Sequence, residues 1–204
     1  MLIALREHNI DERKLQQVVQ CMLGGGVIIY PTDTVYSLGC DMLNKKAVER
    51  IARLKNIRTD KANFSLVCSD LSHLADYCKQ VSNPTFKLMK QLLPGPYTFI
   101  LDAGKNIPNI FSERKKTIGI RVPDNAIAQQ LVQQMGRPII ATSVHDEDEV
   151  LEYTTDPQLI YERWQHEVDM VIDGGILGLE PSTVIDCTGA QPLLVRQGKG
   201  KIAT

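Results

Sequence analysis

The fold is decided by the stretch Gly24-Gly25-Gly26-Val27-Ile28-Ile29-Tyr30-Pro31-Thr32-Asp33-Thr34. Its apolar run, residues 27–30, is uninterrupted, which is typical of a strand buried on both faces. Pro31 ends the strand because proline has no backbone N–H to donate. Upstream, apolar residues recur at helical spacing within residues 11–23, and the three glycines stop them. The stretch therefore predicts a helix that leads into a central strand, with three polar residues at the strand's end.

The same alternation continues along the chain. Helical periodicity predicts further helices over residues 45–57, 71–77, 84–93, 126–135 and 157–166. Apolar runs predict strands over residues 64–68, 97–101, 117–122, 139–142, 170–172, 183–185 and 193–195. This order predicts an α/β fold. The late strands follow one another without room for a helix, so a mixed sheet is expected. No linker rich in Pro, Gly or Ser divides the chain, and one domain over residues 1–204 is expected.

Composition excludes several classes of protein. The 204 residues include 23 Lys and Arg against 24 Asp and Glu, so the chain is not basic overall. Hydrophobic residues make up 43% and charged residues 23%, near the averages of folded proteins. Five widely spaced cysteines without a Cys-x-x-Cys pair indicate neither a disulfide framework nor a thiolate zinc site. No apolar stretch reaches the ~18 residues of a membrane span, and the N-terminus is too charged for a signal peptide. A soluble, cytoplasmic protein is expected.

Charge is nevertheless unevenly distributed. Residues 45–61 hold seven basic side chains against two acidic ones, a local balance of +5. Residues 145–169 hold nine acidic side chains against Arg163, a local balance of −8. A solvated face is the simple interpretation of the acidic run. The basic run continues into a loop beside strand ends, which favours anion binding.

Four short segments with hydroxyl side chains stand where predicted strands begin or end: 31–34, 94–98, 141–143 and 181–183. Each alone is also consistent with ordinary turn chemistry. Together they combine exposed backbone N–H groups with short side-chain donors, which suits phosphate or carboxylate recognition. The cysteines and three of the four histidines, His8, His73 and His166, are in contrast interpreted as structural.

Five motifs occur in an order that is characteristic of one protein family: GGVIIYPTDTVYSLG (25–39), LLPGPYTFI (92–100), GIRVP (119–123), PSTVI (181–185) and VRQG (195–198). On these motifs the chain resembles the YrdC/YciO family over about residues 12–200. The resemblance implies a YrdC-like α/β fold, in which a twisted mixed sheet and its helices surround a large concave, positively charged cavity.

The activity implied by the resemblance is threonylcarbamoyl-AMP synthesis, a nucleotidyltransferase reaction. L-threonine, bicarbonate and ATP give threonylcarbamoyl-AMP and pyrophosphate, which supports threonylcarbamoyladenosine modification of tRNA. ATP would be a substrate accompanied by Mg²⁺, without a tightly bound cofactor or a protein-held metal. Carbamoylated threonine supplies its own carboxylate nucleophile, so the protein has to position substrates and neutralise phosphate charge. The alternative is a protein of the same fold that binds double-stranded RNA or tRNA without synthase activity.

The resemblance also implies site residues. It assigns catalytic roles to Lys55, Arg58 and Ser143, and substrate binding to Thr34, Thr98, Arg121, Thr142, Ser182 and Arg196. Thr34 would contact threonine, and Lys55 with Arg58 would hold the ATP phosphates. Two alternatives stay open: Arg121 could form an ion pair between strands, and Lys55 could be a solvated helix end.

Three departures from the synthase pattern place the chain nearest to the YciO branch. Lys55 and Arg58 are separated by two residues, where the synthases have one. Cys68 stands where the synthases carry a histidine, and Ser143-Val144-His145 replaces their Ser-Ala-Asn segment. An added residue turns a side chain by roughly 100° on a helix, or to the other face of a strand. The two cations are therefore expected to converge differently here.

Overall fold

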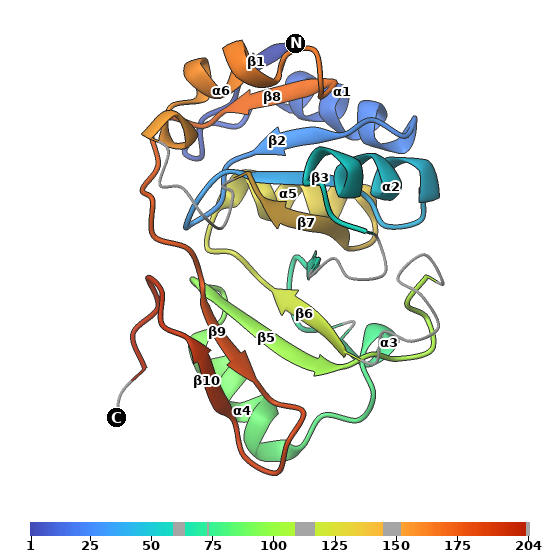
Figure 1. Ribbon diagram of the computed structural model, residues 1–204, viewed down its shortest axis with the longest axis vertical. Helices are drawn as coiled ribbons and strands as arrows, with labels where there is room; N and C mark the ends of the chain where they lie inside the picture. Colours follow the sequence, from blue (N-terminus) through green and yellow to red (C-terminus); the bar gives the residue numbers. More distant parts are fainter. Residues whose placement is uncertain (59–63, 73, 109–116, 145–151, 203–204) are drawn as a thin grey trace.

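The computed structural model describes residues 1–58, 64–72, 74–108, 117–144 and 152–202 (Figure 1). Within these residues, ten strands form one sheet in the order β1-β8-β2-β3-β7-β4-β6-β5-β9-β10. Their bounds are β1 Leu2–Ala4, β2 Ile28–Tyr30, β3 Ser37–Asp41, β4 Ser65–Val67, β5 Tyr97–Asp102, β6 Thr117–Arg121, β7 Ile139–Ser143, β8 Met170–Asp173, β9 Thr183–Asp186 and β10 Leu193–Arg196. Four neighbouring pairs run parallel (β1 with β8, β8 with β2, β4 with β6, β5 with β9), and the other five are antiparallel. The expected α/β fold with a mixed sheet is confirmed.

The helices are α1 Glu12–Leu23, α2 Lys45–Leu54, α3 Leu74–Tyr77, α4 Asn83–Leu92, α5 Ala126–Met135 and α6 Pro157–Trp164, with a short 3-10 turn η2 at Glu152–Thr155. Each of the five longer helices begins after a residue whose side chain accepts hydrogen bonds from the first turn: Asp11, Asn44, Ser82, Asn125 and Asp156. Such N-caps satisfy backbone N–H groups that the helix leaves without partners. The helix starts are thus fixed locally by the sequence.

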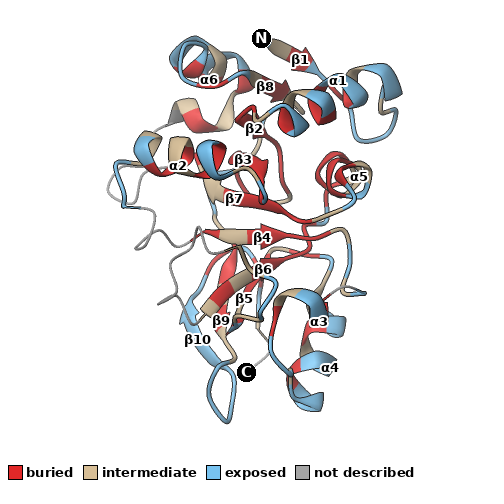
Figure 2. Cartoon of the chain, turned by 90° about the vertical axis from the view of Figure 1, so that its right-hand side faces the viewer, coloured by how far each residue is buried: buried red, intermediate tan, exposed pale blue. Residues whose placement is uncertain are grey.

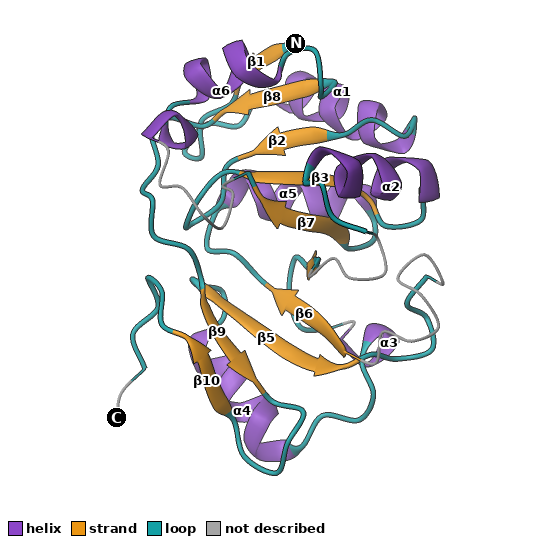
Figure 3. Ribbon diagram, viewed as in Figure 1, coloured by secondary structure: helices purple, strands orange, loops and turns teal. Residues whose placement is uncertain are grey.

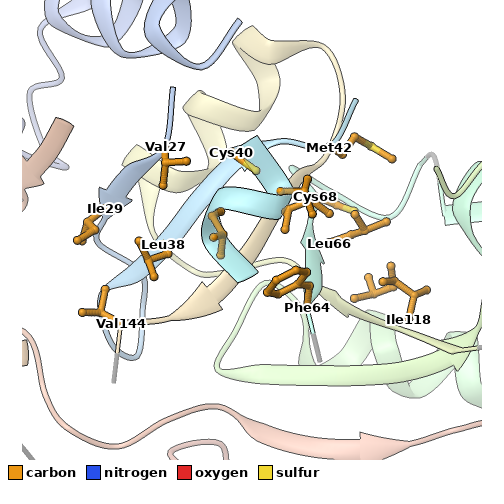
Figure 4. Close-up of a cluster of buried hydrophobic side chains, with 14 of the residues drawn as sticks. Val27, Ile29, Leu38, Cys40, Met42, Phe64, Leu66, Cys68, Ile118 and Val144 are labelled. Atoms are coloured by element: carbon orange, nitrogen blue, oxygen red, sulfur yellow. The ribbon is translucent and has the colours of Figure 1, made fainter. Parts of the chain in front are cut away.

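The strand β2 is buried on both faces, as its apolar run predicts. Ile28 and Tyr30 pack in a cluster with α1 and α5 on one face of the sheet. Val27 and Ile29 point to the other face, into a cluster that includes side chains of β3 and α2 (Figure 4). Because side chains alternate along a strand, one short run contributes to both cores.

Two strands were not expected from the sequence, β1 and β3. All five residues of β3 are buried, but Ser37, Gly39 and Asp41 interrupt the apolar pattern that would have revealed it. Gly39 is required there because a Cβ atom would lie 2.7 Å from the ring of Tyr30. The central strand β3 is therefore selected by packing against its neighbours rather than by strand propensity.

The sheet is covered differently in its two parts (Figure 3). One part, β1, β8, β2, β3 and β7, carries α1, α2, α5 and α6. The other part, β6, β5, β9 and β10, carries α3 and α4 (Figure 1). The edge strand β10 is exposed along its length (Figure 2). No helix among the described residues is long and apolar enough to cross a membrane.

Candidate functional site

A cavity of about 370 Å³ lies where the two parts of the sheet meet. This volume is within the range of small-molecule binding sites. Segments from β3, β4, β5, β6, β7, β9 and β10 line it, together with the loop between β2 and β3. Seven of the nine site residues expected from the sequence are in its wall: Thr34, Thr98, Arg121, Thr142, Ser143, Ser182 and Arg196. The charged side chains among the described lining residues are both arginines.

The loop after β2 is held by its own hydroxyl groups. Thr32 Oγ1 donates to Val35 O over 2.7 Å and accepts from Thr34 N over 3.1 Å. The Thr32 and Thr34 hydroxyl oxygens are 3.0 Å apart, and both side chains are buried. A short Thr-x-Thr segment can close such contacts without any distant partner. The local contacts with Thr32 therefore help to orient the Thr34 hydroxyl in the cavity wall.

Arg121, the last residue of β6, reaches across to this loop. Its Nη2 donates to Asp33 Oδ1 over 2.9 Å and to Thr34 Oγ1 over 3.0 Å. The Arg121 and Asp33 side chains are only 8% and 7% exposed. The ion pair that was left open as an alternative for Arg121 is present, and the residue also lines the cavity. Its role in substrate binding stays a prediction. Its Nε atom is buried and has no hydrogen-bond partner among the described residues.

A second group of hydroxyls lies on β5 and just before β9. Thr98 Oγ1 and Ser182 Oγ form a buried hydrogen bond. Arg196 of β10 donates to Ser182 O through Nη2 over 3.0 Å and through Nε over 3.3 Å. Thr142 and Ser143, at the end of β7, also line the cavity.

The chain after β10 turns back onto the Pro181-Ser182-Thr183 motif. Gly198 N donates to Thr183 Oγ1 over 2.9 Å, and Lys199 N donates to Pro181 O over 2.9 Å. A Cβ atom on Gly198 would overlap the carbonyl oxygen of Pro181, so glycine is needed at this close approach. The Lys199 ammonium also donates to Asp33 O. Asp33 and Lys199 were not among the residues expected at the site, because their partners are far away in the sequence.

Lys55 and Arg58 are not among the residues that line the cavity. Lys55 is the C-terminal cap of α2 and is half-buried, and Arg58 is exposed four residues beyond the end of that helix. Residues 59–63 lie outside the described part, and the next residues, Phe64 and Ser65, are back in the cavity wall. The two cations thus stand on the chain segment that leads into the site, and their roles stay predictions.

The other residues that depart from the synthase pattern, Cys68 and the segment 143–145, lie in different places. Cys68 lies just after β4, buried in the core, and lines a separate hollow next to Arg137 rather than this cavity. Burial raises the pKa of its thiol to about 12, so the thiol stays protonated near neutral pH. Val144 is fully buried, while His145 lies outside the described residues. No group of three or more His, Cys, Asp or Glu side chains in the described ranges could hold a metal ion.

Comparison with known proteins gives consistent results. A profile of the Sua5/YciO/YrdC family, described as "Telomere recombination", matches residues 20–198. The uncharacterized protein YciO of Escherichia coli is 45% identical over 196 residues, 95% of this chain and 93% of that protein. The crystal structure of E. coli YciO superposes with a TM-score of 0.89, covering 98% of this chain and 97% of that one, at 43% identity.

More distant relatives are named as synthases. A threonylcarbamoyl-AMP synthase of Pyrococcus abyssi is 30% identical over 200 residues, which is 97% of this chain but 57% of that protein. The crystal structure of P. abyssi Sua5 complexed with L-threonine superposes with a TM-score of 0.87 at 30% identity, again over 97% of this chain and 57% of that chain.

Proposed function

Because the chain belongs to the Sua5/YciO/YrdC family, we propose that it is an ATP-dependent enzyme of the threonylcarbamoyl-AMP synthase type. In this reaction the amine of L-threonine condenses with bicarbonate to a carbamate, with loss of water, and an oxygen of the carbamate group attacks the α-phosphorus of ATP. The new P–O bond forms as the bond between the α- and β-phosphates breaks, and pyrophosphate leaves. The product, threonylcarbamoyl-AMP, would serve the threonylcarbamoyladenosine modification of tRNA.

The observation that carries this proposal is the buried guanidinium of Arg121 among hydroxyl groups in the cavity wall. A cation that is mostly withdrawn from water is favourable where an anion completes its hydrogen bonds. All three substrates are anionic or carry a carboxylate, which suits a cavity whose charged lining residues, among those described, are both arginines. The hydroxyls of Thr34 and Ser182 add short neutral donors beside that charge.

The proposal divides the cavity between two substrates. Thr34 and Arg121 hold the threonine carboxylate, and the hydroxyls of Thr98 and Ser182 contact the same substrate from the β5 side. Thr142 and Ser143 with Arg196 face the adenylate. Lys55 and Arg58 bind the outgoing pyrophosphate from the segment that enters the wall at Phe64. Mg²⁺ enters with ATP, neutralising part of the triphosphate charge.

The test is pyrophosphate release from Mg-ATP by the pure protein, with and without L-threonine and bicarbonate, with mass detection of the adenylate. Release that requires both co-substrates is the expected result. Release without threonine would indicate a different acceptor. If there is no release while ATP still raises the thermal unfolding temperature, the protein binds nucleotide without this chemistry, and the proposed activity is wrong.

A second candidate function is binding of double-stranded RNA or tRNA. It is favoured by the exposed basic side chains of α2, namely Lys45, Lys46 and Arg53. A protein that neutralises several phosphates loses affinity steeply as salt rises, because condensed counterions are no longer released. Binding of a duplex RNA that weakens at least ~100-fold between 50 and 200 mM salt, and that is reduced by Lys46→Ala, would support it. Affinity that is independent of salt would contradict it.

A further inference from the structure

Asp33, in the loop after β2, accepts hydrogen bonds from two other segments of the chain beside the cavity. Its Oδ1 accepts from Arg121 Nη2 at the end of β6, and its Oδ2 accepts from Asp124 N over 3.2 Å. Its backbone oxygen accepts from the Lys199 ammonium, beyond β10. The partners are 88, 91 and 166 residues away in the sequence. Asp33 therefore connects the loop of one part of the sheet to two segments of the other.

The ion pair uses only one nitrogen of the guanidinium. The hydrogen bonds of Arg121 to Asp33 and to Thr34 both come from Nη2. Nε is buried without a hydrogen-bond partner among the described residues. A buried, unsatisfied N–H of a charged group is costly unless a ligand completes it. Because Arg121 lines the cavity, Asp33 fixes this guanidinium in the wall of the binding site through Nη2.

A second ion pair in the same protein shows the alternative arrangement. Arg137 donates to Asp41 with both Nε, over 2.8 Å, and Nη2, over 2.5 Å. This bidentate pair uses the whole side edge of the guanidinium, which is the geometry that maximises ion-pair strength. It lies away from the cavity, next to the hollow that Cys68 lines. In the Arg121–Asp33 pair, by contrast, Asp33 takes Nη2 and leaves Nε without a partner among the described residues.

We propose that Asp33, whose backbone oxygen accepts from Lys199, is a positioning residue that holds the Arg121 guanidinium in place for the carboxylate of the amino-acid substrate. The inference rests on the proposed function for the identity of that substrate. The carboxylate is assigned to Arg121 because Nη2 of this side chain is bonded to Thr34, the hydroxyl placed at threonine. Lys199 fixes the Asp33 backbone, and Asp33 in turn fixes the direction of the guanidinium.

The first experiment compares Asp33→Asn with Asp41→Asn by steady-state kinetics at a temperature where both variants are folded. Asp33→Asn is expected to raise the KM for L-threonine about tenfold or more while the KM for ATP changes little. Asp41→Asn removes a buried carboxylate charge of the same kind outside the cavity, and is expected to leave both KM values near wild type. An unchanged threonine KM in Asp33→Asn, or an equal rise in both variants, overturns the inference.

The second experiment does not depend on turnover. The Nε–H signal of Arg121 is followed by nitrogen-15 NMR, assigned through its loss in Arg121→Lys, while L-threonine is added. In the wild type the signal is expected to shift and to exchange more slowly with water. In Asp33→Asn the signal is expected to respond only at higher threonine concentrations. In Lys199→Met the threonine concentration needed for the response is expected to rise by a smaller factor. If the protein makes no pyrophosphate yet the signal behaves this way, the proposed function fails and the positioning role stands. A signal with the same position and response in Asp33→Asn overturns the positioning role.

Discussion

Thr98 Oγ1 and Ser182 Oγ lie 2.8 Å apart, although 84 residues separate them in the sequence. Both side chains are buried, 7% and 6% exposed, and both line the cavity. In a pair of hydroxyls one donates to the other, which leaves the second proton available for a ligand. The pair also connects β5 to the segment before β9, so a ligand contact made by one hydroxyl is oriented by the other.

The Ser182→Ala variant tests this pair. We expect a three- to tenfold rise in the KM for threonine, about the worth of one neutral hydrogen bond, with little change in the KM for ATP. The free energy of unfolding should fall by about 1 kcal/mol, because the Thr98 hydroxyl loses its partner. Thr188→Ala is the matched control, since Thr188 is exposed and bonds only to Asp186 among the described residues. Equal losses for threonine and ATP would contradict the division of the cavity.

The variants Lys55→Ala and Arg58→Ala test the assignment of the triphosphate site. Each removes a charge-assisted contact, so we expect ATP affinity to fall about tenfold or more while the unfolding temperature stays near wild type. Isothermal titration calorimetry with ATP measures the effect directly. Lys46→Ala removes a cation from the start of α2 and serves as the control. If both variants keep the ATP affinity of the wild type, the two cations do not hold the phosphates.

The sequence is most informative where the deciding interactions are local. Helix starts follow from caps such as Asp11 and Asn44, and the burial of β2 on both faces follows from four successive apolar residues. The strand β3 was missed because small and polar residues occupy positions that only tertiary packing makes buried. The cavity motifs could be recognised as hydroxyl-bearing segments. No periodicity could indicate that Asp33 meets Arg121 and Lys199, since those contacts are set by the order of strands in the sheet.

The Gly198→Ala variant tests the close approach of the C-terminal segment. The added Cβ would overlap Pro181 O and lie 2.7 Å from the carbonyl carbon of Ser182, which is backbone and cannot turn aside. We expect a loss of about 1–3 kcal/mol in the free energy of unfolding and a rise in the threonine KM, because Ser182 is displaced. Gly189→Ala is the control, since its Cβ would meet nothing closer than 3.7 Å. Similar unfolding temperatures for the two variants would show that the segment is not held as described.

The Asp41–Arg137 pair predicts a pH dependence of stability. Burial alone would raise the pKa of Asp41, but hydrogen bonds from Arg137 and from Leu43 N, together with the Arg137 charge, outweigh it and lower the pKa. A carboxyl whose pKa is lower in the folded state stabilises the protein above its ordinary pKa of about 3.9, and this contribution is lost as pH falls through the folded value. Asp41→Asn should therefore cost about 1.5–3 kcal/mol at pH 7, and the difference from wild type should shrink below about pH 4. Urea unfolding of both proteins between pH 3 and pH 7 measures it. A difference that stays constant over this range would mean that the ionised carboxylate does not provide the stabilisation.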